Sequence, residues 1–394
     1  MAGLCAKLRV LLFVGTVLSL VPCRYRYKMN RFEAKSCLSL FAFTINISLS
    51  SAHMYYDWWQ FWSGNRQHSS HILYFFQLVH TVTYPSTVVC VQLVTFSNRV
   101  HIAALFNALF TDRSWQFVGD FHTNRWHASS YWLGRFSTAV TVGGMVYIAL
   151  LISSIYKSIA PFLKYVTILE GLRVYVTLTA IFIYIVCVQV VKMHLKQVQE
   201  WIERFGSSVN TPRLWCIFMD QYAAAVGMVQ EINRIFSVPL LTILAQVQVQ
   251  LSFQYLMLYC STQQRLGSIA YGLMLFHTQC WESMFLLMLL AVGYTCGSCH
   301  DQIENVNVAV RSSVATVKGD PSHTRKWINR FLLQTLCQTD QHRFRVGGLF
   351  VLDNKFVCMA LTSMATYLVI LIQFEQYEIA NESLMSSNVS YTYF

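Results

Sequence analysis

The sequence predicts an all-α membrane protein in which seven helices cross the bilayer, with the N-terminus in the cytoplasm and the C-terminus outside. Three observations predict this class. Hydrophobic residues make up 55% of the chain and charged residues 12%, with a mean hydropathy of +0.42, whereas soluble domains carry about 25% charged residues. Apolar stretches recur at the length of roughly 20 residues that a membrane helix needs. Lys and Arg are concentrated in alternate connections, as the positive-inside rule requires.

Residues 1–36 form an N-terminal segment, which we place in the cytoplasm. Lys7 and Arg9 precede an apolar run at 10–21, an arrangement that resembles a secretory signal peptide. Cleavage after this run would leave five basic residues outside and oppose the charge pattern of every later connection. We therefore favour an uncleaved apolar segment that lies near the inner membrane surface.

Residues 37–299 contain the first six spans, and the seventh occupies 355–374. Glycines dilute the third and sixth spans, and such glycines are typical of closely packed membrane helices. These are Gly143, Gly144, Gly293 and Gly297. The seven expected spans are 37–55, 72–96, 138–156, 166–191, 238–260, 281–299 and 356–374.

The basic residues set the orientation of these spans. Of 29 Lys and Arg residues, 24 fall in the N-terminal segment and in the connections after the second, fourth and sixth spans, and four fall on the other side. The tail, residues 375–394, contains no Lys or Arg and holds two N-glycosylation patterns, at Asn381 and Asn388, which suits an extracellular location. A G-protein-coupled chemoreceptor has the opposite orientation, and that class is kept as the alternative.

The long cytoplasmic connections are expected to contain helices of their own. Apolar residues keep helical spacing through 192–205, so the fourth helix should continue into the cytosol. An amphipathic helix is expected after Pro321, within a cytoplasmic anchor region at 300–354. Its apolar face suits either a cytoplasmic bundle shared between subunits or the bilayer surface, and both interpretations remain open.

The last span carries a polar and aromatic stripe that a simple membrane anchor would lack. Thr366 and Tyr367 are followed by five aliphatic residues and then by Gln373 and Phe374. Residues seven apart lie on nearly one face of a helix, roughly 10 Å apart along its axis. A helix that faces protein or a water-filled pore can use such a glutamine, whereas a helix that faces lipid gains nothing from it.

A second motif, Phe-Arg-Val-Gly-Gly-Leu-Phe-Val-Leu-Asp at 344–353, precedes this span. Together the two motifs closely resemble the C-terminal signature of insect gustatory receptors. The detailed match covers roughly 331–374, and the rest of the chain matches in topology and size. The residue after the tyrosine is typically glutamate in the sugar-sensing branch of that family, whereas here it is Leu368. The resemblance therefore favours a receptor for bitter or other non-sugar compounds.

The resemblance implies a ligand-gated, nonselective cation channel assembled as a homotetramer or heterotetramer with other gustatory receptor subunits. Its last helix would line the pore, with Gln373 and Phe374 as the gate near the outer mouth and Thr366, Tyr367 and Ile370 deeper. Such a receptor would open on binding a small-molecule tastant in the plasma membrane, at the dendrite of a chemosensory neuron. The residues alone also fit helices that hydrogen-bond within a bundle.

The ligand pocket should lie in the outer half of the first six helices, where the resemblance places it. Three groups of residues are candidates, because polar groups among aromatic walls suit a small-molecule site. Each group also has a structural interpretation, as hydrogen bonds between helices or as aromatic residues at the membrane interface. The groups are the glutamines Gln246, Gln250 and Gln254, the charged pair Glu170 and Arg173, and the pair Trp281 and Glu282.

Other chemical signals are weak. Cys260 and Cys280 flank the short external connection between the fifth and sixth spans, and a disulfide between them is one possible pairing. No metal site, cofactor site or enzyme motif is recognisable, so neither cofactor nor catalytic residue is expected. The net charge of +11 lies in cytoplasmic connections that face anionic membrane lipid, and it does not indicate nucleic acid. A transporter should show internal repeats with broken helices, and none is detected.

Overall fold

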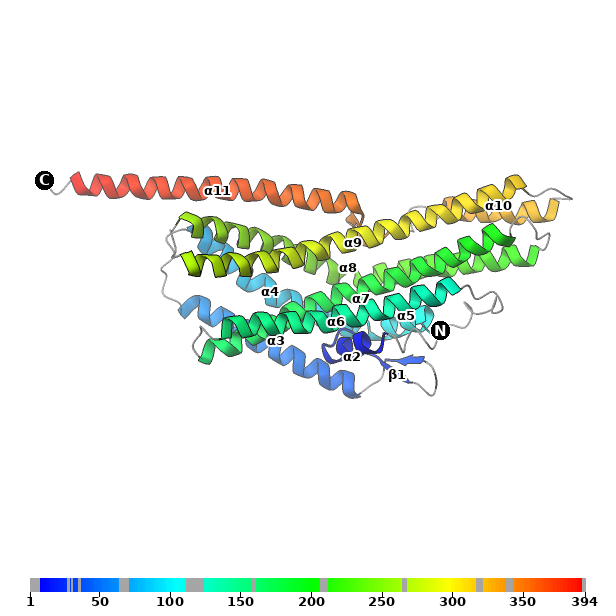
Figure 1. Cartoon of the computed structure of the whole chain (residues 1–394), viewed down its shortest axis with the longest axis horizontal. Coiled ribbons are helices and arrows are strands. Elements are labelled where there is room, and N and C mark those ends of the chain that lie inside the picture. Colours follow the sequence, from blue (N-terminus) through cyan, green and yellow to red (C-terminus); the bar gives the residue numbers. More distant parts are fainter. Residues whose placement is uncertain are drawn as a thin grey trace.

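The computed structural model describes residues 8–26, 29, 31–34, 37–63, 71–110, 124–156, 161–205, 212–263, 268–316, 322–337 and 343–391. The chain forms an elongated bundle of long helices, and α11 lies along one side of it (Figure 1). The helices are α2 (Arg9–Val17), α3 (Cys37–Ser63), α4 (His71–Ser97), α5 (Arg99–Phe110), α6 (Asn124–Tyr156), α7 (Pro161–Phe205), α8 (Pro212–Gln263), α9 (Ser268–Thr316), α10 (Ser322–Cys337) and α11 (Asn354–Tyr391). Two short antiparallel hairpins, β1 (Arg24–Arg26) with β2 (Arg31–Glu33) and β3 (Arg345–Val346) with β4 (Phe350–Val351), are the only strands in the described ranges. The predicted all-α fold class is confirmed.

Six helices of the described part are long and apolar enough to cross a membrane: α3, α4, α7, α8, α9 and α11. The third expected span, 138–156, is helical within α6; it is not among these six because several of its side chains lie outside the described part of the chain. At 33 residues, α6 is about 50 Å long and exceeds the roughly 30 Å hydrocarbon core. Because α6 also packs along α7, we count it with the six, as the third of seven spans in chain order.

The central helices α7, α8 and α9 are 45, 52 and 49 residues long, or roughly 70 to 80 Å. They therefore extend well beyond the bilayer. The expected continuation of the fourth span through Phe205 is confirmed, and its apolar residues Leu195, Val198 and Ile202 are fully buried. The expected division at 299 and 300 falls inside α9, and the division at 374 and 375 falls inside α11, so neither coincides with the end of a helix.

The amphipathic helix expected after Pro321 is α10, and its apolar face packs on this chain's own α8 and α9. Ile328 and Phe331 are buried, and the ring of Phe331 lies 5.3 Å from that of Tyr222 on α8. Neither the bilayer surface nor a second subunit is needed to cover this face. The cytoplasmic ends of α7, α8, α9 and α10 thus form a bundle within one chain.

The N-terminal apolar segment is α2 followed by a tight reversal, and both are part of the hydrophobic core. Leu11, Val14 and Leu18 are almost fully buried, and α2 packs against α3, α6 and α7. The chain turns back at Ser19, whose φ is +63°. The Asn46 side-chain amide on α3 donates to the carbonyl oxygen of Val17 at 2.7 Å. These contacts support an uncleaved segment, because its removal would expose the core that it covers.

Candidate ligand pocket and pore helix

The start of α11 is positioned by the Gly-Gly motif and by Asp353. Gly347 and Gly348 adopt positive φ angles of +60° and +70°, which glycine reaches without the steric cost of a Cβ atom. They form the turn between β3 and β4, which Asn233 of α8 holds by accepting from the Arg345 N–H at 3.1 Å. Asp353 Oδ1 then accepts a hydrogen bond from the Phe356 N–H at 2.8 Å, the geometry of a helix N-cap. The motif therefore anchors α11 to α8.

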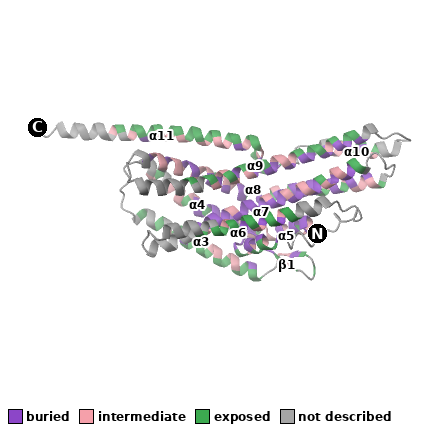
Figure 2. Ribbon diagram, in the orientation of Figure 1, coloured by how far each residue is buried: buried purple, intermediate pink, exposed green. Residues whose placement is uncertain are grey.

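The expected pore residues lie on a helix that the rest of the chain leaves almost bare. Only 6% of an 18-residue window within Asn354–Glu378 of α11 is buried, and Figure 2 shows the described part of the helix as mostly exposed. Tyr367 is 60% exposed, Ile370 40% and Phe374 59%, and Thr366 and Gln373 are exposed as well. These five side chains lie on adjoining faces of α11, where a partner helix or an aqueous pore can contact them.

The outer half of α11 is tied to the outer end of α8 by two polar contacts. Gln376 Nε2 donates to Tyr259 Oη at 2.8 Å, and Cys260 Sγ donates to Glu375 Oε1 at 3.7 Å. Glu375 is only 3% exposed, and Leu371 packs beside Cys260. Because Glu375 and Gln376 directly follow Phe374, these contacts fix α11 at the position of the expected gate. We refer to the four polar residues as the α8–α11 latch.

Cys260 takes part in the α8–α11 latch and not in the disulfide with Cys280 that the sequence analysis named as one pairing. Cys260 is a free thiol bonded to Glu375, so no bridge to Cys280 is formed here, and the Cys280 side chain lies outside the described part. The physical reason is that the Cys260 thiol points across to α11. Sequence spacing within the α8–α9 connection contained no information about that neighbour.

Sequence reasoning also missed Tyr377. It is 67% exposed and continues the row formed by Tyr367, Ile370 and Phe374 at helical spacing. The expected span ended at Phe374, whereas α11 continues through Tyr391. Extending the heptad-like spacing three residues past Phe374 would have found it.

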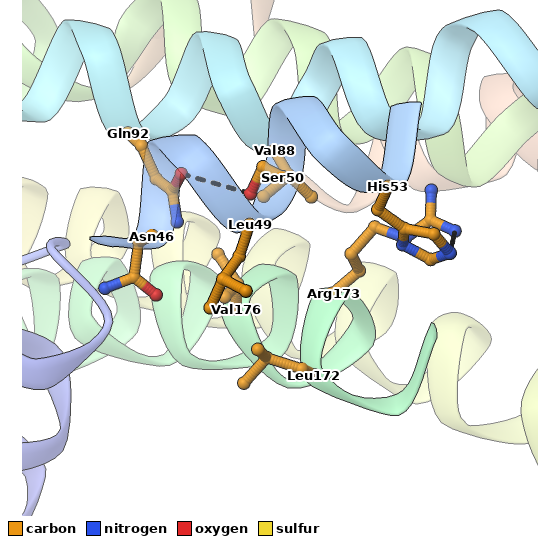
Figure 3. Close-up of a pocket in the computed structure, with 9 residues that line it drawn as sticks. All are labelled: Asn46, Leu49, Ser50, His53, Val88, Gln92, Leu172, Arg173 and Val176. Atoms are coloured by element: carbon orange, nitrogen blue, oxygen red, sulfur yellow. Dashed lines mark hydrogen bonds between the residues drawn. The ribbon is translucent and has the colours of Figure 1, made fainter. Parts of the chain in front are cut away.

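Arg173, a predicted pocket residue, lies in a buried polar cluster between α3, α4 and α7. Its Nη2 donates to His53 Nε2 at 3.0 Å, and its guanidinium carbon lies 4.9 Å from the centre of the Tyr84 ring. The acceptor role of Nε2 places the His53 proton on Nδ1. In Figure 3 His53 and Arg173 point toward each other, while Ser50 and Gln92 face each other one to two turns away, with 3.4 Å between their oxygens.

The space within this Arg173 cluster is small. The cavity lined by Asn46, Ser50, His53, Gln92 and Arg173 has a volume of about 10 Å³, which is room for roughly one water molecule. The cluster therefore offers the donors, the acceptor and the aromatic face that a ligand needs. A small molecule fits only if α3, α4 and α7 separate.

The glutamines of α8 divide between two faces. Gln246 is 2% exposed, and neither side-chain polar atom has a hydrogen-bond partner. The pairing of α4 with α8, marked by Thr87 Oγ1 donating to the Thr242 carbonyl oxygen at 3.5 Å, places Gln246 near the level of Tyr84. Gln250 and Gln254 are partly buried one and two turns further out. Gln248 instead lines a cavity of about 340 Å³ between α8, α9 and α11.

The other predicted site residues are only partly described. The backbones of Glu170, Trp281, Glu282 and Asn388 are helical, in α7, α9 and α11, but their side chains lie outside the described part. Asn381 is half-buried on α11. Within the ranges described, no three His, Cys, Asp or Glu side chains are grouped so that they could hold a metal ion.

Membrane-length helices around a buried polar cluster, with a last helix left bare, define a polytopic membrane receptor. The sequence matches the family described as 7tm Chemosensory receptor over residues 8–378. The chain belongs to this family, and it is a receptor rather than an enzyme. Among curated proteins, no significant match exists.

Two solved structures are similar to this chain. The insect olfactory receptor OR5 from Machilis hrabei in complex with eugenol has a TM-score of 0.69 and 14% sequence identity, with 94% of this chain and 99% of that chain covered. A second structure of the same olfactory receptor from Machilis hrabei has a TM-score of 0.68 and 13% sequence identity, with 93% of this chain and 97% of that chain covered. At these identities the similarity establishes the fold alone.

Proposed function

We propose that this chain is a gustatory receptor: a subunit of a ligand-gated, nonselective cation channel that small non-sugar tastants open. The observation that carries the proposal is the bare face of α11, where aromatic and polar side chains occupy a helix of membrane length. A single copy leaves this face without partners, and a closed ring of copies would place it around a central axis. A homotetramer or heterotetramer in the plasma membrane of a chemosensory dendrite is the assembly that the C-terminal signature favours.

The gate is proposed to work by wetting and dewetting. A ring of Phe374 side chains would exclude water and block ions, while rotation of α11 that brings Gln373 to the axis would admit them. Gln373 and Phe374 are about 100° apart around the helix. A modest rotation therefore exchanges an apolar lining for a polar one.

The latch provides a route from the ligand to the gate. α8 carries Gln246 in the bundle and Tyr259 and Cys260 at its outer end, next to Gln376 and Glu375 of α11. A ligand that fits only an expanded Arg173 cluster would favour that expanded state, because binding shifts populations by the difference in affinity. Movement of α8 would then reach α11 through the latch.

The ligand is proposed to be a small molecule with a hydrogen-bond acceptor and an aromatic or apolar body. Arg173 supplies donors and Tyr84 an aromatic ring, which suits such a molecule. The similar olfactory receptor was solved with eugenol, which is a small molecule with an aromatic body and hydrogen-bond acceptors. Glu170, Gln250, Gln254, Trp281 and Glu282 remain candidate contacts, and Asn381 and Asn388 remain candidate glycosylation sites.

The test is to record tastant-evoked current from excised patches without GTP, with an epitope tag on each terminus. We expect current that persists without nucleotide, a C-terminal tag that antibody reaches on intact cells, and an N-terminal tag that it reaches only after permeabilisation. Loss of current without GTP, or an N-terminal tag readable on intact cells, would instead support a G-protein-coupled chemoreceptor.

A further inference from the structure

A cavity of about 660 Å³ forms a groove between α6 and α9 with α7 as its floor. Its edges are exposed side chains, namely Phe136 and Val140 on α6 and Leu287 and Tyr294 on α9. The groove lies in the cytoplasmic half of the membrane, because it runs along α6 from Leu133 to Gly144, near the cytoplasmic end of that helix. The groove is therefore separate from the Arg173 cluster between α3, α4 and α7.

The inner surface of the groove offers few free polar groups. Thr141 Oγ1 donates to the carbonyl oxygen of Ser137 at 2.7 Å, and Tyr175 Oη donates to the carbonyl oxygen of Thr141 at 3.2 Å. Both hydroxyl donors are thus used within the protein, and Phe182 and Ile185 complete an apolar floor. A tastant needs fixed polar groups for recognition, whereas a hydrocarbon chain needs none.

The cytoplasmic end of the groove carries positive charge. Gln189 and Thr295 line this end, and one turn further toward the cytoplasm the Lys192 ammonium group donates to Ser298 Oγ. On α6 the exposed side chains of Tyr131 and Trp132 lie near this level, and exposed Tyr and Trp side chains are typical of the membrane interface. The Lys192 ammonium group therefore lies where headgroups of the cytoplasmic leaflet begin.

We propose that this groove binds one anionic phospholipid of the cytoplasmic leaflet. An acyl chain lies between α6 and α9 on the floor of α7, and the phosphate lies near Lys192. Two observations support this occupant: an apolar groove that opens toward lipid, and a cation one turn beyond its cytoplasmic end, where anionic headgroups are abundant. The lipid would keep α6 and α9 apart over α7.

Gly143 gives a direct way to fill the groove. It lines the groove, and a Cβ atom added there would meet no atom within 4 Å, so Gly143→Phe places a ring in open space. The matched control is Val142→Phe, since Val142 is 45% exposed and does not line the groove. Lys192→Gln removes the cation beyond the cytoplasmic end and leaves the apolar channel intact.

The experiment uses the full chain in phosphatidylcholine vesicles that contain phosphatidylserine with a photoactivatable acyl chain. After illumination, mass spectrometry maps and quantifies the labelled peptides. In the native protein we expect labels on α6, α7 and α9. Gly143→Phe should lower this labelling by roughly tenfold, the effect of about two fewer buried methylene groups, and Val142→Phe should not. Lys192→Gln should abolish the preference for photoactivatable phosphatidylserine over photoactivatable phosphatidylcholine.

Three results would overturn the proposal. Equal labelling of the Gly143→Phe and Val142→Phe variants would show that lipid contacts only the outer surface. Cross-links from groove residues to a second copy of the chain would make the groove a subunit interface. An unchanged lipid preference in Lys192→Gln would show that no anionic headgroup binds beside Lys192. Size-exclusion chromatography of each variant checks that the protein is folded.

Discussion

Phe374 is the residue on which the proposed closed state depends. Its side chain is 59% exposed on a face that no part of the described chain covers. We expect Phe374→Ala to raise the current that flows without ligand, because a ring of methyl groups leaves a wider and more easily wetted path. Leak current normalised to surface protein measures the effect. Val369→Ala is the matched control, since Val369 is 54% exposed on another face, and equal leak in both variants would contradict the gate.

Arg173 is the residue that distinguishes a ligand site from a packing contact. We expect Arg173→Gln to raise the half-maximal tastant concentration by roughly tenfold or more, because loss of a charged hydrogen-bond donor from a buried site costs about 1.5 to 3 kcal/mol. Arg204→Gln changes an exposed arginine near the cytoplasmic end of the same helix and should leave the dose–response curve in place. If both variants respond like the native channel, the Arg173 cluster has only a structural role.

Asp353 connects the signature motif to the stability of the pore helix. Asp353→Ala removes the acceptor that the Phe356 N–H uses, and we expect the free energy of unfolding to fall by about 1 kcal/mol. Asp353→Asn keeps a side-chain acceptor and should retain most of that stability. Thermal unfolding of purified protein compares the two. If Asp353→Asn lost as much stability as Asp353→Ala, the side-chain cap would contribute nothing.

At the scale of elements, the glycines of the third and sixth spans have different roles although the sequence suggests one. A Cβ atom on Gly293 of α9 would come within 2.3 Å of Val357 Cγ2 on α11 and 3.2 Å of the Asp353 carbonyl oxygen. Gly293 therefore allows α9 to pack closely against the start of α11. At Gly143 and Gly144 of α6, by contrast, the missing side chains widen the groove.

Gly293→Ala should accordingly destabilise the contact between α9 and α11 by about 1 to 3 kcal/mol, the usual range for overpacking. Gly297→Ala, one turn along the same helix, is the control, because its added Cβ would meet only Asn354 Nδ2, at 3.9 Å. It should be neutral or slightly stabilising. Thermal unfolding and surface expression report both effects. Equal loss in the two variants would contradict close packing at Gly293.

At the scale of the whole molecule, a single copy leaves most of the described part of α11 bare. We expect Ile370→Cys to form disulfide-linked dimers under mild oxidation, since Ile370 lies on the face proposed to meet other subunits. Leu371→Cys should not, because Leu371 packs against α8. Non-reducing electrophoresis of membranes measures both. Dimers in neither variant, or in both to the same extent, would argue against α11 at the centre of an assembly.

Much of this architecture follows from local sequence. Apolar stretches of fixed length and the distribution of Lys and Arg predict membrane helices and their orientation, because both depend on short segments. The N-cap role of Asp353 and the turn at Gly347 and Gly348 likewise depend on neighbours in the chain. The α8–α11 latch does not, because Glu375 meets Cys260 only after two distant helices pack. The partners of Arg173 and the groove beside Gly143 are tertiary in the same way.

The N-terminal segment has a consequence for the time course of synthesis. Gly15 in α2 is so close to α7 that an added Cβ would lie 3.0 Å from Ile183 Cδ1, yet Ile183 is translated far later. At about 5 to 20 residues per second, the apolar segment leaves the ribosome roughly ten to thirty seconds before its partner exists. During that interval the membrane surface or a chaperone must shelter it. Docking of the first helix in this receptor therefore has to wait until α7 has been synthesised.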